Sequence, residues 1–313
     1  MALKQDYRVV LFVGGVGGAK LAYGLAHLLP PERLTIVVNV GDDFWHLGLK
    51  ICPDSDTVMY TLGSMVDPVN GWGLDGDSTR MLEAFRGLGG DAWFRLGDLD
   101  MATHLYRTQR LRDGARLTDV TASLCSSLGI LHPLYPVTDA DVPTIVDTIE
   151  HGELPFQEYF VRHRWQPVLR GLRFVGASEA SITPEVATAL DAADAIVFAP
   201  SNPWLSIAPM LAVGDLRERI EARDVPRVAM TPIIGGAAVK GPAAKLMAEL
   251  GLAVSGESVA DYYGPLINGF VDDSRNQPFE RPALCIESYD TLMTDDAARI
   301  RVARELLAMI GLM

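Results

Sequence analysis

The stretch LFVGGVGGAKLAYGL, Leu11–Leu25, combines an apolar run, a glycine-rich turn and a lysine. The turn contains four glycines: Gly14, Gly15, Gly17 and Gly18. Glycines let a backbone come close to an anion, and the helix expected after them presents N–H groups at its N-terminus. Lys20 adds a positive charge. The pattern predicts a phosphate-binding turn; the alternative is a tight strand-to-helix turn with a surface lysine.

Two familiar phosphate motifs do not fit this turn. The dinucleotide pattern G-x-G-x-x-G matches Gly15 and Gly17 but has Lys20 in the third place. The P-loop pattern fails because Ala19 stands where glycine is required and Leu21 follows the lysine. The turn therefore supports neither a nicotinamide cofactor nor ATP hydrolysis.

The segment NVGDDFWHLGLKICPDSDTV, Asn39–Val58, carries four carboxylates: Asp42, Asp43, Asp54 and Asp56. Clustered carboxylates repel one another unless a cation or donor groups compensate, and Mg²⁺ prefers oxygen ligands that it shares with phosphates. Three interpretations stay open: a magnesium site, hydrogen bonds to ligand hydroxyls, or a solvated loop in which Asp54 or Asp56 caps the next helix. Trp45, in the same segment, could stack on a planar ligand or pack in the interior.

The segment WFRLGDLDMATHLYRTQRLRDG contains further charged groups. We expect Arg95 at the end of a short strand, where a guanidinium can grip phosphate or stack on a ring. Asp98 is expected to cap the helix that follows it. His104, on that helix, is expected to be a structural histidine rather than a catalytic base.

Two later loops are rich in polar and turn-forming residues, APSNPWLSI and TPIIGGAAVKG. Ser201 and Asn202 can donate and accept hydrogen bonds, and Gly235 and Gly236 allow close approach of a ligand. Lys240 adds a cation with no assigned partner. The alternative is a pair of ordinary strand-to-helix loops. Neither G-x-S-x-G nor HExxH occurs in the sequence, which argues against hydrolases built on those motifs.

The elements that must position these residues follow an α/β rhythm. Apolar runs at 8–13 and 34–40 predict buried parallel strands joined by a helix. Residues 41–57 are expected to form a loop at the carboxyl edge of the sheet, where ligands of such sheets bind. Amphipathic helices are expected around 78–86, 101–110 and 117–128.

The pattern changes from about 133 to 182, where short strands of a mixed or antiparallel lobe are expected. We therefore predict an α/β core with a mostly parallel sheet, formed by 1–132 and 183–313. Residues 133–182 form a small inserted α+β lobe in this prediction.

The bulk composition limits the partners. The chain has 313 residues, 49% of them hydrophobic, and a formal net charge of −13, so a general nucleic-acid or membrane-surface binder is not expected. Three scattered cysteines, no signal-peptide pattern and no apolar run of roughly 18 residues lead us to expect a cytoplasmic protein with small-molecule substrates.

Taken in order, GGVGGAKLAYGL, NVGDDFWHLGLKICPDSDTV, RLGDLDMATH, APSNPWLSI and TPIIGGAAVKGPAAKLM resemble the 2-phospho-L-lactate transferase family of coenzyme F420 biosynthesis. The resemblance runs from about residue 8 to 295. It implies transfer of a phospholactyl or phosphoenolpyruvyl group from a guanosine-diphosphate-activated donor to the terminal ribityl hydroxyl of the deazaflavin FO, with release of GMP. It also implies a Rossmann-like, doubly wound fold with a small inserted lobe, Mg²⁺ and a homodimer. The alternative is a nucleotide-sugar-binding regulator of the gluconeogenesis-factor type, without transferase activity.

The resemblance also implies roles for individual residues. Asp56 and Arg95 fall on FO-binding positions, with Trp45 nearby, and Asp56 is expected to orient the FO hydroxyl and accept its proton. We expect Asp42 and Asp43 to bind magnesium, which makes Asp43 part of the catalytic group. The nucleotide and phosphates are assigned to the glycine turn and to the two later loops: Gly14, Gly15, Gly17, Gly18, Lys20, Ser201, Asn202, Gly235 and Gly236.

Overall fold

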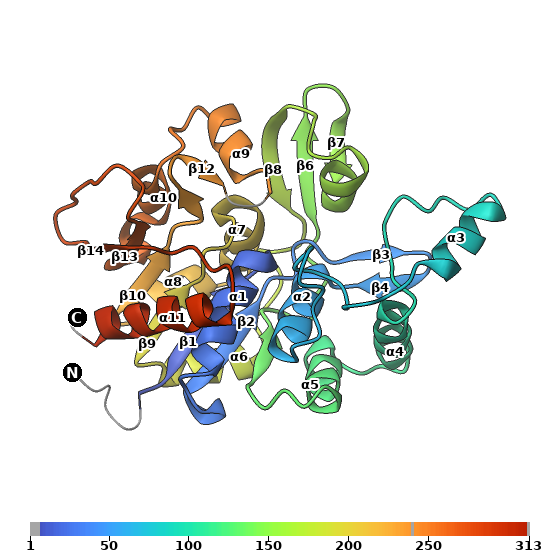
Figure 1. The fold of residues 1–313 in the computed structure, drawn as a ribbon, viewed down its shortest axis with the longest axis horizontal. Helices are drawn as coiled ribbons and strands as arrows, with labels where there is room; N and C mark the ends of the chain where they lie inside the picture. The colour runs from blue at the N-terminus through green and yellow to red at the C-terminus, as the bar shows by residue number, and fades with distance from the viewer. Residues whose placement is uncertain (1–6, 239–240, 312–313) are drawn as a thin grey trace.

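The computed structural model describes residues 7–238 and 241–311, and its centre is a seven-stranded sheet (Figure 1). The strand order is β14-β13-β10-β9-β1-β2-β5, and all neighbouring pairs are parallel. The predicted α/β class is therefore confirmed. The strands are β1 (Val9–Val13), β2 (Leu34–Val38), β5 (Leu134–Pro136), β9 (Ala195–Phe198), β10 (Arg227–Met230), β13 (Gly269–Asp273) and β14 (Cys285–Tyr289).

The strand order reverses beside β1. Its neighbours are β2, the next strand along the chain, and β9, which begins at Ala195. In open α/β sheets, ligands bind outside the carboxyl ends of the strands at such a reversal. The turn after β1 begins at Gly14 and the loop after β9 contains Ser201, so two of the predicted ligand-binding segments meet there.

Both faces of the sheet are covered by apolar cores, which explains the continuous apolar runs. In β1, Phe12 lies in the core on one face, and Leu11 and Val13 lie in the core on the other. Burying each such side chain contributes about 1.5–3 kcal/mol. The Leu11 face is covered by α1 (Gly15–Ala26), α2 (Pro53–Leu62), α5 (Leu117–Ser127) and α11 (Asp296–Ile310), and the Phe12 face by α6 (Pro184–Ala192), α8 (Leu216–Glu221) and α10 (Gly256–Tyr263).

The prediction of a loop at 41–57 is wrong for most of that segment. Residues Phe44–His46 (β3) and Leu49–Ile51 (β4) pair as an antiparallel hairpin, and α2 begins at Pro53. Leu47 and Gly48 both have positive φ, as a two-residue hairpin turn requires, and proline favours the first position of a helix. Asp54 and Asp56 therefore lie in the first turn of α2.

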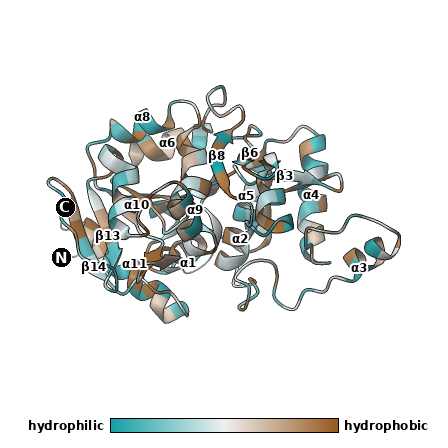
Figure 2. Cartoon of the chain, turned by 90° about the horizontal axis from the view of Figure 1, so that it is seen from above, coloured by the Kyte–Doolittle hydropathy of each residue, from teal (hydrophilic) through white to brown (hydrophobic). Residues whose placement is uncertain are grey.

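Residues 63–99, here called the excursion, leave the body of the protein after α2. They carry α3 (Arg80–Gly87), which stands apart from the other elements in Figure 2, and lead into α4 (Asp100–Arg112). The Asp98 carboxylate accepts from the N–H groups of α3, at 3.1 Å from Arg80 N and 3.0 Å from Met81 N. Asp98 thus caps α3, not the helix that follows it as expected.

The inserted lobe contains an antiparallel sheet of β6 (Thr144–Thr148), β7 (Gly152–Pro155) and β8 (Leu169–Phe174), at the top of Figure 1. β5 pairs with β2 in the main sheet, so the separate sheet begins at Thr144 and not at 133. The division of the chain into core and lobe stays a prediction.

Among the described helices, none has both the length and the apolar character of a membrane span. The remaining elements are η1 (Pro31–Arg33), the π-helices η2 (Glu158–Arg162) and η3 (Pro203–Ile207), α7 (Ala208–Leu211), β11 (Ile233–Ile234), β12 (Ala237–Ala238), α9 (Ala243–Glu249) and η4 (Gly264–Leu266).

Candidate active site

A cavity of about 800 Å³ opens at the carboxyl edge of the sheet, beside the strand reversal. Its wall comes from the glycine turn, the start of α2, the excursion, η2 and the loops that follow β9, β10 and β14. A volume of this size suits a small-molecule site. The expected meeting of distant loops at one edge of the sheet is therefore present.

The glycine turn forms one side of the cavity through Gly14, Gly15 and Gly17. A Cβ atom at Gly17 would lie 2.5 Å from the carbonyl oxygen of Pro200, so close packing against the loop after β9 requires glycine whatever the ligand. Gly15 N donates to Asp54 Oδ1 at 2.6 Å, so the protein's own carboxylate occupies part of this helix N-terminus. Gly17, in the first turn of α1, has no helical carbonyl four residues before it and can donate to an anion.

Ser201, Asn202 and Lys20, predicted to bind the nucleotide or its phosphates, each form hydrogen bonds with backbone groups of the protein. Ser201 Oγ accepts from Gly14 N at 3.0 Å and donates to Gly14 O at 2.8 Å. Asn202 Oδ1 caps η3 by accepting from Trp204 N at 3.0 Å. Lys20 Nζ donates to the carbonyl of Met293 at 2.7 Å. Ser201, Asn202 and Lys20 line the cavity, so their hydrogen bonds within the fold hold its wall.

Two buried carboxylates, Asp42 and Asp54, lie together on the cavity wall. Asn39 Nδ2 donates to Asp54 Oδ2 at 3.0 Å and lies 3.5 Å from Asp42 Oδ1. Burial raises the pKa of Asp42 well above its usual value, and the neighbouring Asp54 raises it further. Burial raises the pKa of Asp54 to about 6, against hydrogen bonds from Asn39 and Gly15 that lower it. Such a pair is suited to a divalent cation with phosphate as a shared ligand.

Asp43 is directed to a different environment, outside the cavity wall. Its Oδ2 lies 3.7 Å from Lys50 Nζ, which also donates to Asp141 at 2.6 Å. Burial raises the pKa of Asp43 to about 7, against the charge of Lys50 that lowers it. The structure therefore pairs Asp42 with Asp54 rather than with its chain neighbour.

A buried ionic network, here called the Arg107 network, adjoins this pair. Arg107 donates through both terminal nitrogens to the two carboxylate oxygens of Asp56, at 3.2 Å for Nη1 to Oδ2. His104 lies between two carboxylates, with Nδ1 3.7 Å from Asp56 Oδ2 and Nε2 3.2 Å from Asp100 Oδ2. Tyr60 donates to Asp100 Oδ1 at 2.6 Å. Asp56 also lines the cavity, where its remaining lone pairs can accept from a ligand hydroxyl.

The same network could offer a second cation site. Ligand atoms of Asp56, Asp100 and His104 lie within 4.8 Å of one another. The Arg107 guanidinium already compensates Asp56, however, so the Asp42–Asp54 pair is the better cation site. His104 has the structural contacts that were expected, but the sequence did not indicate that it would reach the cavity wall.

Trp45, the aromatic residue predicted to contact a ligand, is not among the aromatic residues that line the cavity. Trp45 is 50% exposed on β3, where it faces Lys50 across the hairpin, and lies outside the cavity wall. Arg95 does line the cavity, in an extended segment that is not a strand, with its guanidinium carbon 5.6 Å from the ring centre of Trp72. Among the other aromatic residues of the wall, Phe156, Phe160 and Trp165 come from one aromatic-rich segment, FQEYFVRHRW, at 156–165. The aromatic lining consists of Trp72, Phe94, Phe156, Phe160 and Trp165 together with Tyr60.

The later glycine loop is a tight hairpin turn. Gly235 and Gly236 join β11 to β12 with φ of 58° and 75°, values that favour glycine, and both lie outside the cavity wall. Gly18 also lies outside it, packed so that a Cβ atom would be 2.6 Å from Ser201 Oγ. Lys240 is outside the described residues.

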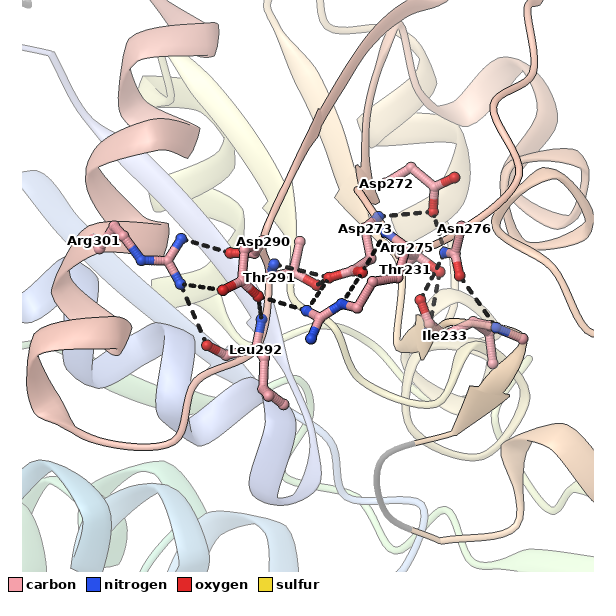
Figure 3. Close-up of polar contacts among 11 residues, drawn as sticks. Thr231, Ile233, Asp272, Asp273, Arg275, Asn276, Asp290, Thr291, Leu292 and Arg301 are labelled. Atoms are coloured by element: carbon pink, nitrogen blue, oxygen red, sulfur yellow. Dashed lines mark hydrogen bonds and ion pairs between the residues drawn. The ribbon is translucent and has the colours of Figure 1, made fainter.

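A polar network around Asp273 joins two segments of the cavity wall (Figure 3). Asp273, at the end of β13, accepts from Arg275 Nε at 2.7 Å and from the N and Oγ1 of Thr291 at 2.9 and 2.8 Å. Asn276 Nδ2 donates to the carbonyl of Ile233 at 2.8 Å. Thr291 lines the cavity, and Ile233 precedes Ile234, which also lines it. The network thus positions the loops after β10 and β14.

Comparisons with known proteins agree along the whole chain. A family model described as 2-phospho-L-lactate transferase CofD matches residues 9–303. A 2-phospho-L-lactate transferase from Methanosarcina mazei is 41% identical over 290 residues, which cover 91% of this chain and 95% of that protein. A phosphoenolpyruvate transferase from Streptomyces griseus is 39% identical over 311 residues, which cover 96% and 98%. A solved structure from the UPF0052 family of Bacillus halodurans shares the fold, with a TM-score of 0.64 at 15% identity, over 97% of this chain and 100% of that one.

Proposed function

Because the chain belongs to the 2-phospho-L-lactate transferase CofD family, we propose that it transfers a 2-phospho acid from a guanosine-diphosphate-activated donor to the terminal ribityl hydroxyl of FO, releasing GMP. Family membership makes it a phospho-acid transferase of coenzyme F420 biosynthesis. The deazaflavin acceptor, the guanosine donor and the GMP product are the finer parts of the proposal. One observation carries it: a single cavity joins a glycine turn, a carboxylate pair and an aromatic wall.

In the proposed reaction, the diphosphate lies beside Gly17 and Lys20. The deazaflavin ring lies against Trp72 and Arg95, which brings its ribityl hydroxyl toward Asp56. The hydroxyl oxygen bonds to the phosphorus that carries the acid, the bond from that phosphorus to the bridging oxygen breaks, and GMP leaves with the electron pair. The hydroxyl proton passes to Asp56. The protein mainly positions the groups and compensates charge, as in other phosphoryl transfers.

We propose Mg²⁺ as the cofactor, held by Asp42 and Asp54. The fit rests on their burial, their mutual repulsion and the absence of an ion pair from either one among the described residues. Bound magnesium would neutralise charge on the diphosphate and the departing GMP. Asp43, expected as a second ligand, is replaced in this proposal by Asp54, because Asp43 faces Lys50.

The decisive experiment offers the purified protein FO with guanosine-diphosphate-activated lactate, enolpyruvate or glycerate and identifies the product by mass. We expect the mass of FO joined to one phospho acid, together with GMP, and no product when EDTA removes the metal. The named relatives make lactate and enolpyruvate the first donors to try. If no donor yields product and FO fluorescence does not change on titration, the nucleotide-sugar-binding alternative replaces the transferase. The homodimer stays a prediction, which analytical ultracentrifugation can check.

A further inference from the structure

Residues 156–165, here called the η2 segment, contribute six residues to the cavity wall: Phe156, Gln157, Phe160, Val161, Arg164 and Trp165. At the start, Gln157 is 5% exposed and its Nε2 donates to the carbonyl of Asp42 at 3.2 Å. Near the end, Arg162 forms an ion pair with Asp91 at 2.7 Å and lies 5.6 Å from the ring centre of Trp93. The segment therefore spans the distance between the proposed magnesium site and the excursion.

The η2 segment ends in an unfavourable backbone conformation. Two consecutive residues, Arg164 and Trp165, have left-handed φ of 51° and 46°. Side-chain-bearing residues in this region cost roughly 1–2 kcal/mol each. Trp165 N donates to the carbonyl of Tyr159 at 2.9 Å, which helps to hold the turn. Both left-handed residues line the cavity, and strain of this kind is concentrated at ligand sites.

Arg164 differs from the other cationic side chains of the cavity wall. Lys20 donates to a backbone carbonyl, and Arg95 lies over the ring of Trp72. Arg164 makes no side-chain hydrogen bond, ion pair or ring contact with any residue in the described part of the chain. Arg164 is an exposed residue of the cavity wall, so its guanidinium is available to an anionic group of a ligand.

We propose that Arg164 binds the carboxylate of the transferred 2-phospho acid, an inference that rests on the proposed function. The acid is attached to the phosphorus that the hydroxyl attacks, so its carboxylate lies between the diphosphate and the deazaflavin. The η2 segment covers this interval, because it begins at the carbonyl of Asp42 and reaches Trp93, two residues from Arg95. In the proposed reaction, the glycine turn, Lys20 and the metal already compensate the charge of the diphosphate. The carboxylate needs a cation of its own, and the planar fork of arginine matches its two oxygens.

The first test is steady-state kinetics of Arg164→Ala and Arg164→Lys. We expect Arg164→Ala to raise the KM for the activated acid by about 10- to 100-fold, the loss of a charge-assisted pair, while the KM for FO changes less than about threefold. The inhibition constant of GDP, which lacks the acid, stays unchanged. Arg164→Lys recovers only part of the loss. The matched control is Arg170→Ala on β8, whose guanidinium pairs with Asp147 on the surface and which leaves every constant unchanged.

A binding experiment separates this inference from the proposed function. Phosphoenolpyruvate, a free 2-phospho acid, should raise the melting temperature of the wild type more than inorganic phosphate does, and Arg164→Ala should abolish that difference. An equal difference in the variant overturns the inference even if the wild type proves to be an active transferase. So does a rise in the GDP inhibition constant that matches the rise in donor KM, since Arg164 would then bind phosphate. A wild type that forms no product contradicts the proposed function, while the phosphoenolpyruvate comparison still decides the role of Arg164.

Discussion

At the scale of single residues, the guanidinium of Arg107 ties the candidate site to the stability of the fold. It is 1% exposed and is the largest of the fully buried side chains in the described residues. Its partner Asp56 lines the cavity, so one carboxylate serves both an internal ion pair and the proposed acceptor hydroxyl. Removing one charge of a buried pair leaves the other uncompensated. Variants of either residue must therefore be tested for folding and for turnover.

Arg107→Met should lower the free energy of unfolding by about 3–5 kcal/mol, because Asp56 would stay buried without its cation. Urea denaturation measures the change. Arg112→Met is the control on the same helix, since that exposed guanidinium donates to the carbonyl of Gly48 and to nothing else in the part of the chain that the structure describes, and it should cost less than about 1 kcal/mol. Adding Asp56→Asn to Arg107→Met should recover part of the loss. A single-variant loss no larger than the control's would mean that the pair does not stabilise the fold.

Arg95→Ala should raise the KM for FO more than the KM for the nucleotide donor. The reason is its place on the cavity wall, over the ring of Trp72. Initial rates with each substrate varied in turn provide both constants, and Arg86→Ala, on the exposed α3, serves as the control. The opposite ranking would put Arg95 on the phosphate side of the cavity.

At the scale of elements, aspartate side chains fix segments of the cavity wall by accepting hydrogen bonds from backbone N–H groups about 20 residues away in the chain. Asp77 accepts from the first N–H groups of α4, at 2.8 Å from Leu99 N and 2.9 Å from Asp100 N, while Asp98 caps α3. Asp77, which precedes α3, thus caps α4, and Asp98, which precedes α4, caps α3. These reciprocal caps fix the N-terminal ends of both helices. Asp273 likewise fixes the loop after β14 through its two hydrogen bonds from Thr291.

The Asp273 network predicts a dependence of stability on pH. Burial alone would raise the pKa of Asp273, but hydrogen bonds from Arg275 and Thr291 lower it to about 2. A lowered folded-state pKa stabilises the fold above the unfolded value of about 3.9, and this stabilisation is lost as the pH falls toward 2. Asp273→Asn should therefore cost on the order of 2 kcal/mol at neutral pH and roughly half of that near pH 3.

Chemical denaturation of wild type and Asp273→Asn at both pH values measures this difference. Asp261→Asn is the comparison, because its pairing with Arg281 lies on the surface. A cost for Asp273→Asn that does not change with pH would show that the carboxylate charge contributes nothing.

At the scale of the whole molecule, the strand reversal at β1 gathers the excursion, the inserted lobe and the later loops around one cavity. The Asp42–Asp54 pair lies at this meeting point with pKa values raised by burial. A raised folded-state pKa of a carboxyl means that stability is lost as the pH rises through that pKa, here about 6 for Asp54. The metal-free protein is therefore expected to be less stable at pH 7.5 than near pH 5, as far as this pair contributes.

Magnesium should reverse that loss. Adding Mg²⁺ to EDTA-treated protein should raise the melting temperature at pH 7.5, by about 2–4 °C for each kcal/mol of binding, and by less near pH 5, where protons occupy the carboxylates. The double variant Asp42→Asn, Asp54→Asn should show no magnesium effect. Asp43→Asn should retain it, because Asp43 faces Lys50. A magnesium effect that disappears in Asp43→Asn but persists in the single variant Asp54→Asn would restore the first assignment, Asp42 with Asp43.

The α/β class, the buried strands at 8–13 and 34–40, the helices near α3, α4 and α5, and the family could all be predicted from the sequence. These follow from local periodicity and from the order of motifs, which depend on residues close together in the chain. Which side chains meet at the cavity could be read only from the folded protein. Asp42 joins Asp54 rather than Asp43, and Trp72 reaches the cavity where Trp45 does not.

The decisive contacts join residues that are far apart along the chain. Asp56 meets Arg107 across 51 positions and Gln157 meets the carbonyl of Asp42 across 115. Neither pairing leaves a periodic signal in the sequence, because the partner of a buried charge depends on how helices and loops pack and on which groups lose contact with water.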